Sequence, residues 1–351
     1  MMHRRPTQAD VARLAGVSKS TVGFALSDRY DIAIPETTRQ RVKRAALEIN
    51  YRPNLAARAL TSGRMNAVTI AFPGSIHSYH ARVLEAFEYH SNMHGYHLIA
   101  STIGSLDSHK SGLDFSTLLH GPSDAVVLVD AFGHYMPDVN EILSGPKPVV
   151  SMGITSIDGI DSVLIDLKAG GDAACRHLID GGARNIMYFG VNLPQADIPA
   201  YIAKCLVSDD ADPRCIAFCR TADAAGLPIH MVGGDLNDRR ATIETLEAYI
   251  AANGCPDAIF CHNDTLAIRV HGVLRRLGFQ MPRDVRLVGC DGIEVCEDIE
   301  PPVSTIKQPV EEMCKAAWDF LQTRLAEPER PRQFVRIEAQ FLPRASSTST
   351  L

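Results

Sequence analysis

The residues best suited to bind another molecule lie in one short stretch, Gln8 to Ser27. Apolar spacing predicts a helix over 8–14 and a second helix over 19–26, joined at Gly16, where glycine ends a helix because it accepts a positive φ. Two short helices with a tight turn form a helix-turn-helix, whose second helix enters the DNA major groove and presents its N-terminal residues to base edges. A small helical hairpin without a DNA role is the alternative for this stretch taken alone.

Two further features of this stretch can be checked against a structure. The first helix is expected to place Val11, Leu14 and Val17 on one apolar side. Ser18 is expected to cap the second helix, because a serine hydroxyl accepts a hydrogen bond from a free N–H group in the first helical turn.

The distribution of charge favours the DNA interpretation. Residues 1–65 hold twelve Lys or Arg and five Asp or Glu, a net charge of +7, whereas the rest of the chain holds 23 basic and 36 acidic residues, a net charge of −13. A basic head on an acidic body indicates a polyanion partner at the head only. Because the basic head coincides with the helix-turn-helix, double-stranded DNA is the predicted partner.

Length and composition restrict the class of protein. At 351 residues the chain exceeds the usual size of one hydrophobic core, so two or three domains are expected. No apolar run approaches the ~20 residues of a membrane span, and the start MMHRRPTQ lacks the apolar segment of a secretion signal. The nine cysteines form no CxxC pair and are expected to be reduced. These features predict a cytoplasmic protein with no membrane partner.

After the helix-turn-helix, a third helix is predicted over 36–49, opened by Pro35. It carries four basic residues, some of which can meet phosphates: Arg39, Arg41, Lys43 and Arg44. Pro53 breaks this helix, and Asn54 can cap one more short helix, LAARAL. A helix of this length does not persist alone in water, so it is expected to be disordered until something packs against it.

From Ala67 onward, short apolar runs alternate with helical segments. Ten runs are expected to be strands: 67–72, 97–101, 125–130, 148–152 and 162–165, followed by 185–190, 228–233, 257–262, 285–290 and 334–339. Near-continuous apolar strands with helices between them indicate parallel sheets covered on both faces. Five strands in each half predict two doubly wound subdomains with a cleft between them, and ligands bind such sheets at the carboxyl ends of the strands.

Residues 7–64 resemble the headpiece of the lactose-repressor (LacI/GalR) family of bacterial transcription regulators. The signatures are DVARLAGVSKSTV, TTRQRV, the AALEINYRPN run and the short hinge segment that ends in Leu60. The body resembles the family's periplasmic-binding-protein-like core, so the resemblance covers nearly the whole chain. It implies a small all-α headpiece and an α/β core of two doubly wound parallel-sheet subdomains.

The resemblance also implies domain boundaries, with three chain crossings between the subdomains, near 165–167, 306–309 and 334–336. The expected parts are a helix-turn-helix domain (1–53), a hinge helix and linker (54–66), a first core subdomain (67–165 and 309–334), a second core subdomain (166–308 and 335–343) and a flexible tail (344–351).

In the family, three positions of the second helix meet base edges, which implies contacts from Lys19, Ser20 and Phe24. Lysine donates to guanine O6 and N7, and serine can bond several bases. Phe24 departs from the usual polar residue. It either covers a thymine methyl group or turns inward and packs, and the sequence leaves both interpretations open.

Other headpiece positions are implied to touch the DNA backbone or the minor groove. Thr7, Ser18, Thr21 and Thr38 match positions that usually touch phosphate, with helix caps and surface hydroxyls as the alternative. Asn54, Ala57 and Leu60 match the spacing of the family's hinge helix. There the leucine wedges between central bases and kinks the duplex, as intercalating side chains do, whereas the alternative role is an anchor for the linker.

Three motifs of the second half resemble the family's ligand-binding side: RCIAF (214–218), CHNDTLAI (261–268) and VGCDGIE (288–294). They imply contacts from Arg214, Asn263 and Asp291, because a guanidinium, an amide and a carboxylate hold adjacent hydroxyls by directional hydrogen bonds. This trio suits a sugar or another polyol, although purines and other small polar molecules are held this way in the family. Asp264 is expected to cap the next helix. The other candidate contacts are Tyr79, Asp130, Leu236 and Gln308.

No enzyme, metal or cofactor is predicted, because GxxxxGK[ST], GxSxG and HExxH are absent. The histidines between His77 and His97 show no ligand spacing, and a redox or metal group of Cys215, Cys219 and His262 is the least favoured interpretation. The resemblance implies a homodimer that binds a pseudo-palindromic operator and responds to a small effector. The tail ASSTSTL has no leucine heptads, so no tetramer is expected. The alternative is a regulator that answers to a protein partner or to no signal.

Overall fold

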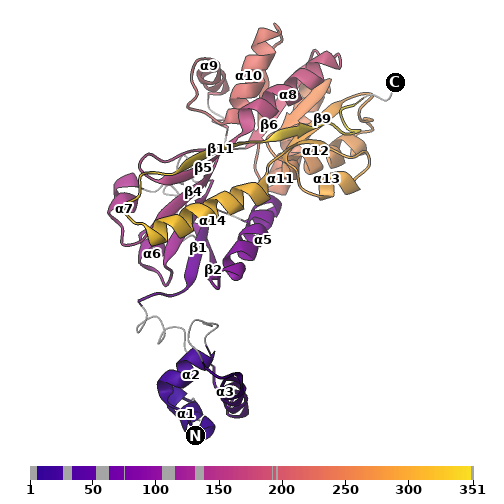
Figure 1. Cartoon of the computed structure of the whole chain (residues 1–351). Helices are drawn as coiled ribbons and strands as arrows, with labels where there is room; N and C mark the ends of the chain where they lie inside the picture. Colours follow the sequence, from indigo (N-terminus) through magenta and orange to yellow (C-terminus); the bar gives the residue numbers. More distant parts are fainter. Residues whose placement is uncertain are drawn as a thin grey trace. The chain divides into compact units, whose positions relative to one another are not determined.

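A computed structural model of the chain describes residues 6–26, 34–52, 63–74, 76–104, 115–130, 138–191, 193–194 and 197–348. The chain divides into two compact units, Met1–Asn66 and Ala67–Leu351, called here the headpiece and the core (Figure 1). Among the described residues, no helix is both long enough and apolar enough to cross a bilayer.

The described part of the headpiece contains α1 (Gln8–Ala15), α2 (Lys19–Leu26) and α3 (Glu36–Glu48). These three predicted helices are confirmed to within one residue at each end, and the predicted helix LAARAL lies outside the described residues. Gly16 ends α1 in the left-handed region, with φ of 63°, and the Ser18 hydroxyl accepts a hydrogen bond from the Thr21 N–H at 3.1 Å as the predicted cap. The helices share a small core in which Val22 and Val42 are completely buried.

The expected apolar side of α1 is partly wrong. Val11 is buried, but Leu14 is 46% exposed, and Ala12 and Ala15 take its place in the core. The three buried residues form one stripe at positions i, i+1 and i+4 of the helix, which faces α2 and α3. Small alanines in that stripe allow the three short helices to approach closely.

The first core subdomain is built on a six-stranded sheet in which every pairing is parallel. The strand order is β11-β5-β4-β3-β1-β2. The strands are β1 (Ala67–Pro73), β2 (His97–Ile103), β3 (Ala125–Val129), β4 (Val149–Gly153), β5 (Asp161–Asp166) and β11 (Phe334–Glu338), and the helices are α5 (Ser78–Met93), α6 (Phe115–His120), α7 (Val139–Ser144) and α14 (Val310–Ala326). Helices α5 and α14 lie side by side (Figure 1).

The second core subdomain has the same design, with strand order β12-β10-β9-β8-β6-β7. Only β12 is antiparallel to its neighbour. The strands are β6 (Ile186–Val191), β7 (His230–Gly234), β8 (Ala258–Cys261), β9 (Arg286–Asp291), β10 (Ser304–Lys307) and β12 (Gln340–Leu342), and the helices are α8 (Leu167–Asp180), α9 (Ile198–Val207), α10 (Pro213–Ala224), α11 (Arg239–Asn253), α12 (Asp264–Arg276) and α13 (Val295–Asp298).

All ten predicted strands form, and the structure adds β10 and β12, which have four and three residues. The first two crossings lie where they were predicted, between β5 and α8 and between β10 and α14. The predicted third crossing is wrong, because Phe334–Glu338 pairs with β5 in register with residues 162–166 and therefore belongs to the first subdomain. The chain crosses after β11, at Ala339, immediately before β12.

The expected flexible tail is wrong for residues 344–348. Ser346 and Ser347 are buried, and the Ser346 carbonyl accepts a hydrogen bond from the Leu287 N–H at 3.0 Å. The Ser304 N–H donates to the Ser346 hydroxyl oxygen at 2.9 Å. Serine provides both a backbone and a side-chain acceptor here, so these residues satisfy buried groups of β9 and β10 beyond the end of β12.

A buried ion pair closes the first subdomain. The side chain of Asp161, at the start of β5, is 1% exposed and accepts two hydrogen bonds from the Arg324 guanidinium of α14, at 2.8 and 2.9 Å. The main-chain N–H of Gln333 donates to the same carboxylate at 2.7 Å. These contacts join α14 and the segment before β11 to the sheet.

Candidate functional site

The predicted base-reading residues lie on the exposed side of α2. Val22 and Ala25 face the headpiece core, whereas Lys19 and Ser20 are exposed. Phe24 is 37% exposed, so it does not turn into the core. Ser20 and Phe24 are four residues apart and therefore share one face of the helix. Inward packing of Phe24 in the core is therefore not observed, and its contact with a base stays a prediction.

Most of the side-chain hydroxyls predicted to touch phosphate make contacts within the headpiece itself. Thr7 and Asp10 form a capping box, in which the Thr7 N–H and hydroxyl both donate to the Asp10 carboxylate, at 2.9 and 2.7 Å. Ser18 lies 2.8 Å from both the Ser20 and the Thr21 hydroxyl. Thr38 is half-buried in the first turn of α3. Their phosphate contacts stay predictions.

The four basic residues of α3 divide into two kinds. Arg39 is 4% exposed and donates to the carbonyls of Phe24 and Ala25, both at 3.3 Å, so it holds the end of α2 and is not presented to phosphate. Arg41, Lys43 and Arg44 are exposed. The hinge positions Asn54, Ala57 and Leu60 lie outside the described residues.

The predicted effector residues gather at the carboxyl ends of the core strands, where ligands bind doubly wound sheets. In the first subdomain, Asp130 follows β3 and Tyr79 lies in the first turn of α5, just after β1. In the second subdomain, Asn263 follows β8, Asp291 ends β9 and Gln308 follows β10. We call this group of residues, together with Arg214 and the neighbouring histidines, the cleft.

Arg214 is buried and already has a carboxylate partner. Its Nε and Nη2 donate to the two oxygens of Asp212, at 2.8 and 2.6 Å, and its Nη1 donates to the carbonyl of His262 at 3.1 Å. Burial raises the pKa of Asp212, but the guanidinium outweighs that effect and holds the pKa well below its usual range. The pair is therefore ionised and carries no net charge, while two N–H groups of Arg214 remain for a ligand.

Asn263, and not Asp264 as expected from the sequence, caps α12. The Asn263 side chain caps α12 by accepting a hydrogen bond from the Leu266 N–H at 2.9 Å. Asp264 is not the cap: its carboxylate accepts hydrogen bonds from the N–H groups of Gly292 and Ile293, at 2.7 and 2.9 Å, and from the Thr305 hydroxyl at 2.7 Å. Asp264 therefore fixes the loop that follows Asp291.

Asp291 is held in an unusual conformation. It is 4% exposed and has φ of 129°, a region that residues with a side chain rarely adopt. Its carboxylate accepts a hydrogen bond from the Gln308 Nε2 at 2.9 Å. Burial, followed by the nearby carboxylate of Asp264, raises the pKa of Asp291 well above its ordinary value. Strained residues of this kind cluster at ligand sites.

The first subdomain contributes an aromatic and imidazole wall. His77 and His80 stack with ring centroids 4.0 Å apart, and the Nε2 of His80 lies 3.8 Å from the Asp130 carboxylate. Burial and the adjacent His80 lower the pKa of His77 to about 4, so His77 is neutral near pH 7. Asp130 has φ of 47°, and a Cβ added to Gly153 would lie 2.4 Å from its Oδ1. Glycine at 153 therefore makes room for this carboxylate.

The two sides of the cleft are close enough to influence one another. Burial, followed by Asp130 and Asp291 from opposite subdomains, raises the pKa of Tyr79. Burial and Arg214, with a smaller effect of His77, lower the pKa of His262 to about 3. The Tyr188 hydroxyl lies within hydrogen-bond distance of the Nδ1 of His262, at 3.0 Å.

Four polar atoms of the cleft are buried without a hydrogen-bond partner among the described residues. They are the Nδ1 atoms of His77 and His80, the hydroxyl of Tyr79 and the Oε1 of Gln308. A buried polar atom without a partner costs about 1–3 kcal/mol, so such atoms are rare in finished cores. Four of them together indicate a site whose partners come from a bound molecule.

The structure therefore brings together Tyr79, Asp130, Arg214, Asp291 and Gln308, with Asn263 serving as a cap beside them. Leu236 packs partly buried on the core of the second subdomain, and its carbonyl accepts a hydrogen bond from Arg269 at 2.7 Å. Its contact with a ligand stays a prediction.

Sequence reasoning missed four cleft residues, although each carried a signal. His77 and His80 stand three residues apart, which places them on one side of a helical turn. Asp212 stands before Pro213, as a helix cap often does, and two residues from Arg214. His262 precedes Asn263 within the motif already identified.

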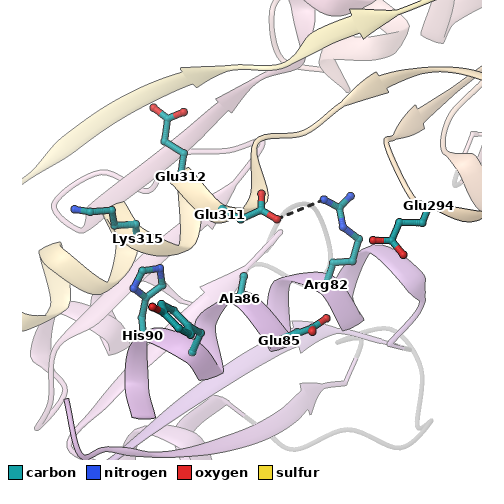
Figure 2. Close-up of a pocket in the computed structure, with 9 residues that line it drawn as sticks. Arg82, Glu85, Ala86, His90, Glu294, Glu311, Glu312 and Lys315 are labelled. Carbon is teal, nitrogen blue, oxygen red and sulfur yellow. Dashed lines mark ion pairs between the residues drawn. The ribbon is translucent and has the colours of Figure 1, made fainter. Parts of the chain in front are cut away.

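A separate surface groove of about 670 Å³ lies where α5 and α14 meet the loop after β9 (Figure 2). Arg82 of α5 points along this groove towards Glu311, with which it makes an ion pair at 3.9 Å. Its guanidinium also donates to the carbonyls of Asp291 and Gly292, at 3.3 and 2.8 Å. Arg82 thus joins the first subdomain to the loop of the second that carries the cleft carboxylate.

Comparison with known proteins gives matches over both units. Residues 7–54 match the family described as bacterial regulatory proteins, lacI family, and residues 175–347 match the periplasmic binding protein-like domain. The chain is 26% identical over 342 residues to the ribose operon repressor of Haemophilus influenzae, with 97% of this chain and 98% of that protein covered. It is 27% identical over 345 residues to the transcriptional repressor PurR of Vibrio parahaemolyticus, with 96% and 97% covered.

The fold is also that of a solved repressor. A lac repressor dimer bound to operator and the anti-inducer ONPF matches with a TM-score of 0.77 at 18% identity, covering 99% of this chain and 100% of that one. The relatives are repressors rather than enzymes. A lacI-type headpiece, a periplasmic-binding-protein-like core and end-to-end similarity to curated repressors together show that this chain belongs to the lactose-repressor (LacI/GalR) family of bacterial transcription regulators.

Proposed function

We propose that this protein is a repressor that binds a pseudo-palindromic operator as a homodimer and changes its operator affinity when a small polar molecule, a sugar or a sugar derivative, occupies the cleft. The observation that carries the proposal is the group of four unpartnered polar atoms in the cleft, in a chain whose other unit exposes Lys19, Ser20 and Phe24 on α2. The first feature supports a ligand, and the second supports base contacts.

The proposed mechanism is a two-state switch. Ligand in the cleft contacts Tyr79 and Asp130 from one subdomain and Asp291 and Gln308 from the other, so it favours whichever angle between the subdomains satisfies all four. That angle sets the spacing of the two hinge segments, each with Leu60, across the dimer. A ligand shifts this equilibrium only by its difference in affinity for the two states.

The test begins with DNA, because operator binding does not require the effector to be known. Selection of the full-length protein against random duplexes is expected to enrich an inverted repeat whose half-sites are read by two headpieces. Sedimentation then measures the assembly, and a stable tetramer would count against the dimer. Enrichment of no sequence would contradict the repressor assignment.

The effector is tested next on the selected operator. A panel of sugars, sugar phosphates and purines is screened by thermal unfolding, since a molecule that binds only the folded state raises the melting temperature. Stabilising compounds are then added to gel-shift titrations. If sequence-specific binding is present but no small molecule alters it, the regulator answers to a protein partner or to no signal, and the effector part of the proposal is wrong.

A further inference from the structure

The charge of the cleft restricts the chemical class of the effector more narrowly than membership of the family does. Among the described residues, no lysine or arginine side chain is bonded to the two cleft carboxyl groups, those of Asp130 and Asp291. Arg214 is held by Asp212 through both of its forked contacts and so contributes donors without net charge. Arg82 bonds the main-chain oxygens of Asp291 and Gly292 and pairs with Glu311, and Lys307 is exposed and makes no ion pair within the described residues.

The neighbouring histidines do not offset the negative charge of these two carboxyl groups. His77 and His262 are neutral near pH 7, because burial lowers the pKa of each to about 4 and about 3. The Nε2 of His80 stands 3.8 Å from the Asp130 oxygen, which is longer than a hydrogen bond. In the sequence, residues 131–137, which follow Asp130, contain no lysine or arginine.

The open hydrogen-bonding positions beside Asp130 and Asp291 are acceptors. Asp291 receives one side-chain hydrogen bond, from Gln308, and the Gln308 Oε1 is buried without a partner. Asp130 is partly exposed, at 18% of its side chain, and is accommodated by Gly153. A carboxylate is an acceptor only, with about four lone-pair positions. A ligand that fits beside them is therefore rich in donors, and one with positive charge would supply a counter-charge that the described residues do not bond to these carboxyl groups.

We infer that the effector is a polyhydroxylated amine, whose ammonium group lies between Asp130 and Asp291 and whose hydroxyl groups meet Tyr79, Gln308 and Arg214. This inference rests on the proposed function and deepens it. The same electrostatics disfavour sugar phosphates and sugar acids, because their charge would face the carboxyl groups of Asp130 and Asp291, to which no described lysine or arginine side chain is bonded.

The experiment compares sugars that differ only in charge. Full-length protein is titrated with a neutral, an amino and an acidic member of each of several frames, for example glucose, glucosamine, glucuronate and glucose 6-phosphate, with the galactose and mannose counterparts. In at least one frame the amine is expected to bind about tenfold or more tightly than its neutral partner, because a hydrogen bond to a charged group is worth roughly twice a neutral one. The acidic members are expected not to bind.

Proton release provides an independent readout. A cation beside Asp291 lowers the pKa of that carboxyl, so binding of the amine is expected to release protons, whereas binding of a neutral sugar is not. Calorimetry in two buffers of different ionisation enthalpy measures the number released. Asp130→Asn and Asp291→Asn should each abolish the preference for the amine while leaving the protein folded, since asparagine has nearly the same shape as aspartate and, at 130, tolerates the positive φ of 47°.

Two variants complete the design. Gly153→Ala should displace the Asp130 carboxylate and weaken amine binding without changing any charge. Asp298→Asn, at an exposed aspartate of the same subdomain as Asp291, is the matched control and should change nothing. Equal or tighter binding of a neutral or acidic member, or no binding of any amine, overturns the inference. If a neutral or acidic sugar alters operator affinity, the inference about an amine is wrong but the proposed function is not. Failure of the inference can thus be distinguished from failure of the proposed function.

Discussion

Arg82 in the first core subdomain and Asp291 in the second are joined through the main chain: the guanidinium donates to the Asp291 carbonyl at 3.3 Å and to the next carbonyl, that of Gly292, at 2.8 Å. The contact reaches the residue that supplies the cleft carboxylate and has the unusual φ of 129°. A surface side chain of one subdomain thereby helps to hold the geometry of a ligand position in the other (Figure 2).

Removal of the Arg82 guanidinium should destabilise the loop that follows β9. Arg82→Met keeps the aliphatic stem and loses the donors, and it is expected to lower the free energy of unfolding by about 1–3 kcal/mol, the usual loss for charge-assisted hydrogen bonds. Lys315→Met, in the same groove, removes only an exposed pair with Asp319 and should cost less than about 0.5 kcal/mol. Urea unfolding at pH 7 measures both, and equal values would contradict the role given to Arg82.

Disruption of the ion pair between Asp161 and Arg324 is expected to cause a larger loss of stability. Asp161→Asn leaves the guanidinium of Arg324, a side chain only 17% exposed, without its counter-charge, so a loss of about 3–5 kcal/mol in the free energy of unfolding is expected. Arg324→Met should be of similar size, because it leaves the carboxylate unpaired. If the double variant cost no less than the sum of the single variants, the two residues would not be coupled.

Acid should destabilise the core through its buried histidines. The pKa values of His77 and His262 are lowered to about 4 and about 3 in the folded state, so below pH 6.5 the unfolded chain binds more protons than the folded one. Stability is therefore complete above pH 6.5 and falls towards pH 4, by roughly 1.4 kcal/mol per pH unit for each group at most.

The contribution of one histidine can be isolated. In His77→Asn, the loss of unfolding free energy between pH 7 and pH 5 should be smaller than in the unmodified protein by roughly 1–2 kcal/mol. His97→Asn, at an exposed histidine on β2, is the control and should follow the unmodified protein. The same pH dependence in His77→Asn as in the control would show that His77 is not neutral in the fold.

Phe24 is expected to act on sequence preference as well as on folding. Its side chain is 37% exposed, so Phe24→Ala should lower the free energy of unfolding by about 1–2 kcal/mol, less than the truncation of a fully buried phenylalanine. Loss of an apolar contact to a thymine methyl should reduce discrimination at one base pair of each half-site by roughly 1–3 kcal/mol. Gel-shift titrations over all single-base changes of the selected operator measure this, and an unchanged profile would exclude Phe24 from base contact.

A substitution at Leu60 tests whether the predicted hinge helix enters the minor groove. If it wedges into the minor groove, Leu60→Ala should weaken operator binding by about tenfold or more, because the kink that permits wider contact is lost. Effector affinity should be unchanged, since the cleft lies wholly in the other unit. Unchanged operator affinity would leave Leu60 as an anchor of the linker.

Helix bounds and strand positions followed closely from the sequence, because apolar spacing, Gly16 and the capping residues are local signals. The sheet to which Phe334–Glu338 belongs did not follow, because strand pairing depends on contacts with residues 162–166, far away in the chain. The buried serines at 346 and 347 were missed for a similar reason: small polar residues resemble a tail until β9 and β10 supply their partners.

The cleft was predicted in outline and not in its electrostatics. Arg214 and Asp291 were identified, but the sequence could not show that Asp212 would hold both forked contacts of the guanidinium. Nor could it show which of two adjacent residues would cap α12. Asn263 takes the cap because Asp264, with two acceptor oxygens, can bond the loop after β9 and Thr305 at once.

The arrangement of the last two strands bears on how the chain matures during translation. β11 completes the edge of one sheet and β12 the edge of the other, and the two are separated by one residue. The ribosome must therefore have released residue 338 before the first sheet can close and residue 342 before the second can, although most of each subdomain is synthesised long before. The headpiece core, built from residues 11–51, has no such requirement. Nascent chains should thus carry a finished headpiece ahead of a core whose two halves reach their final form together.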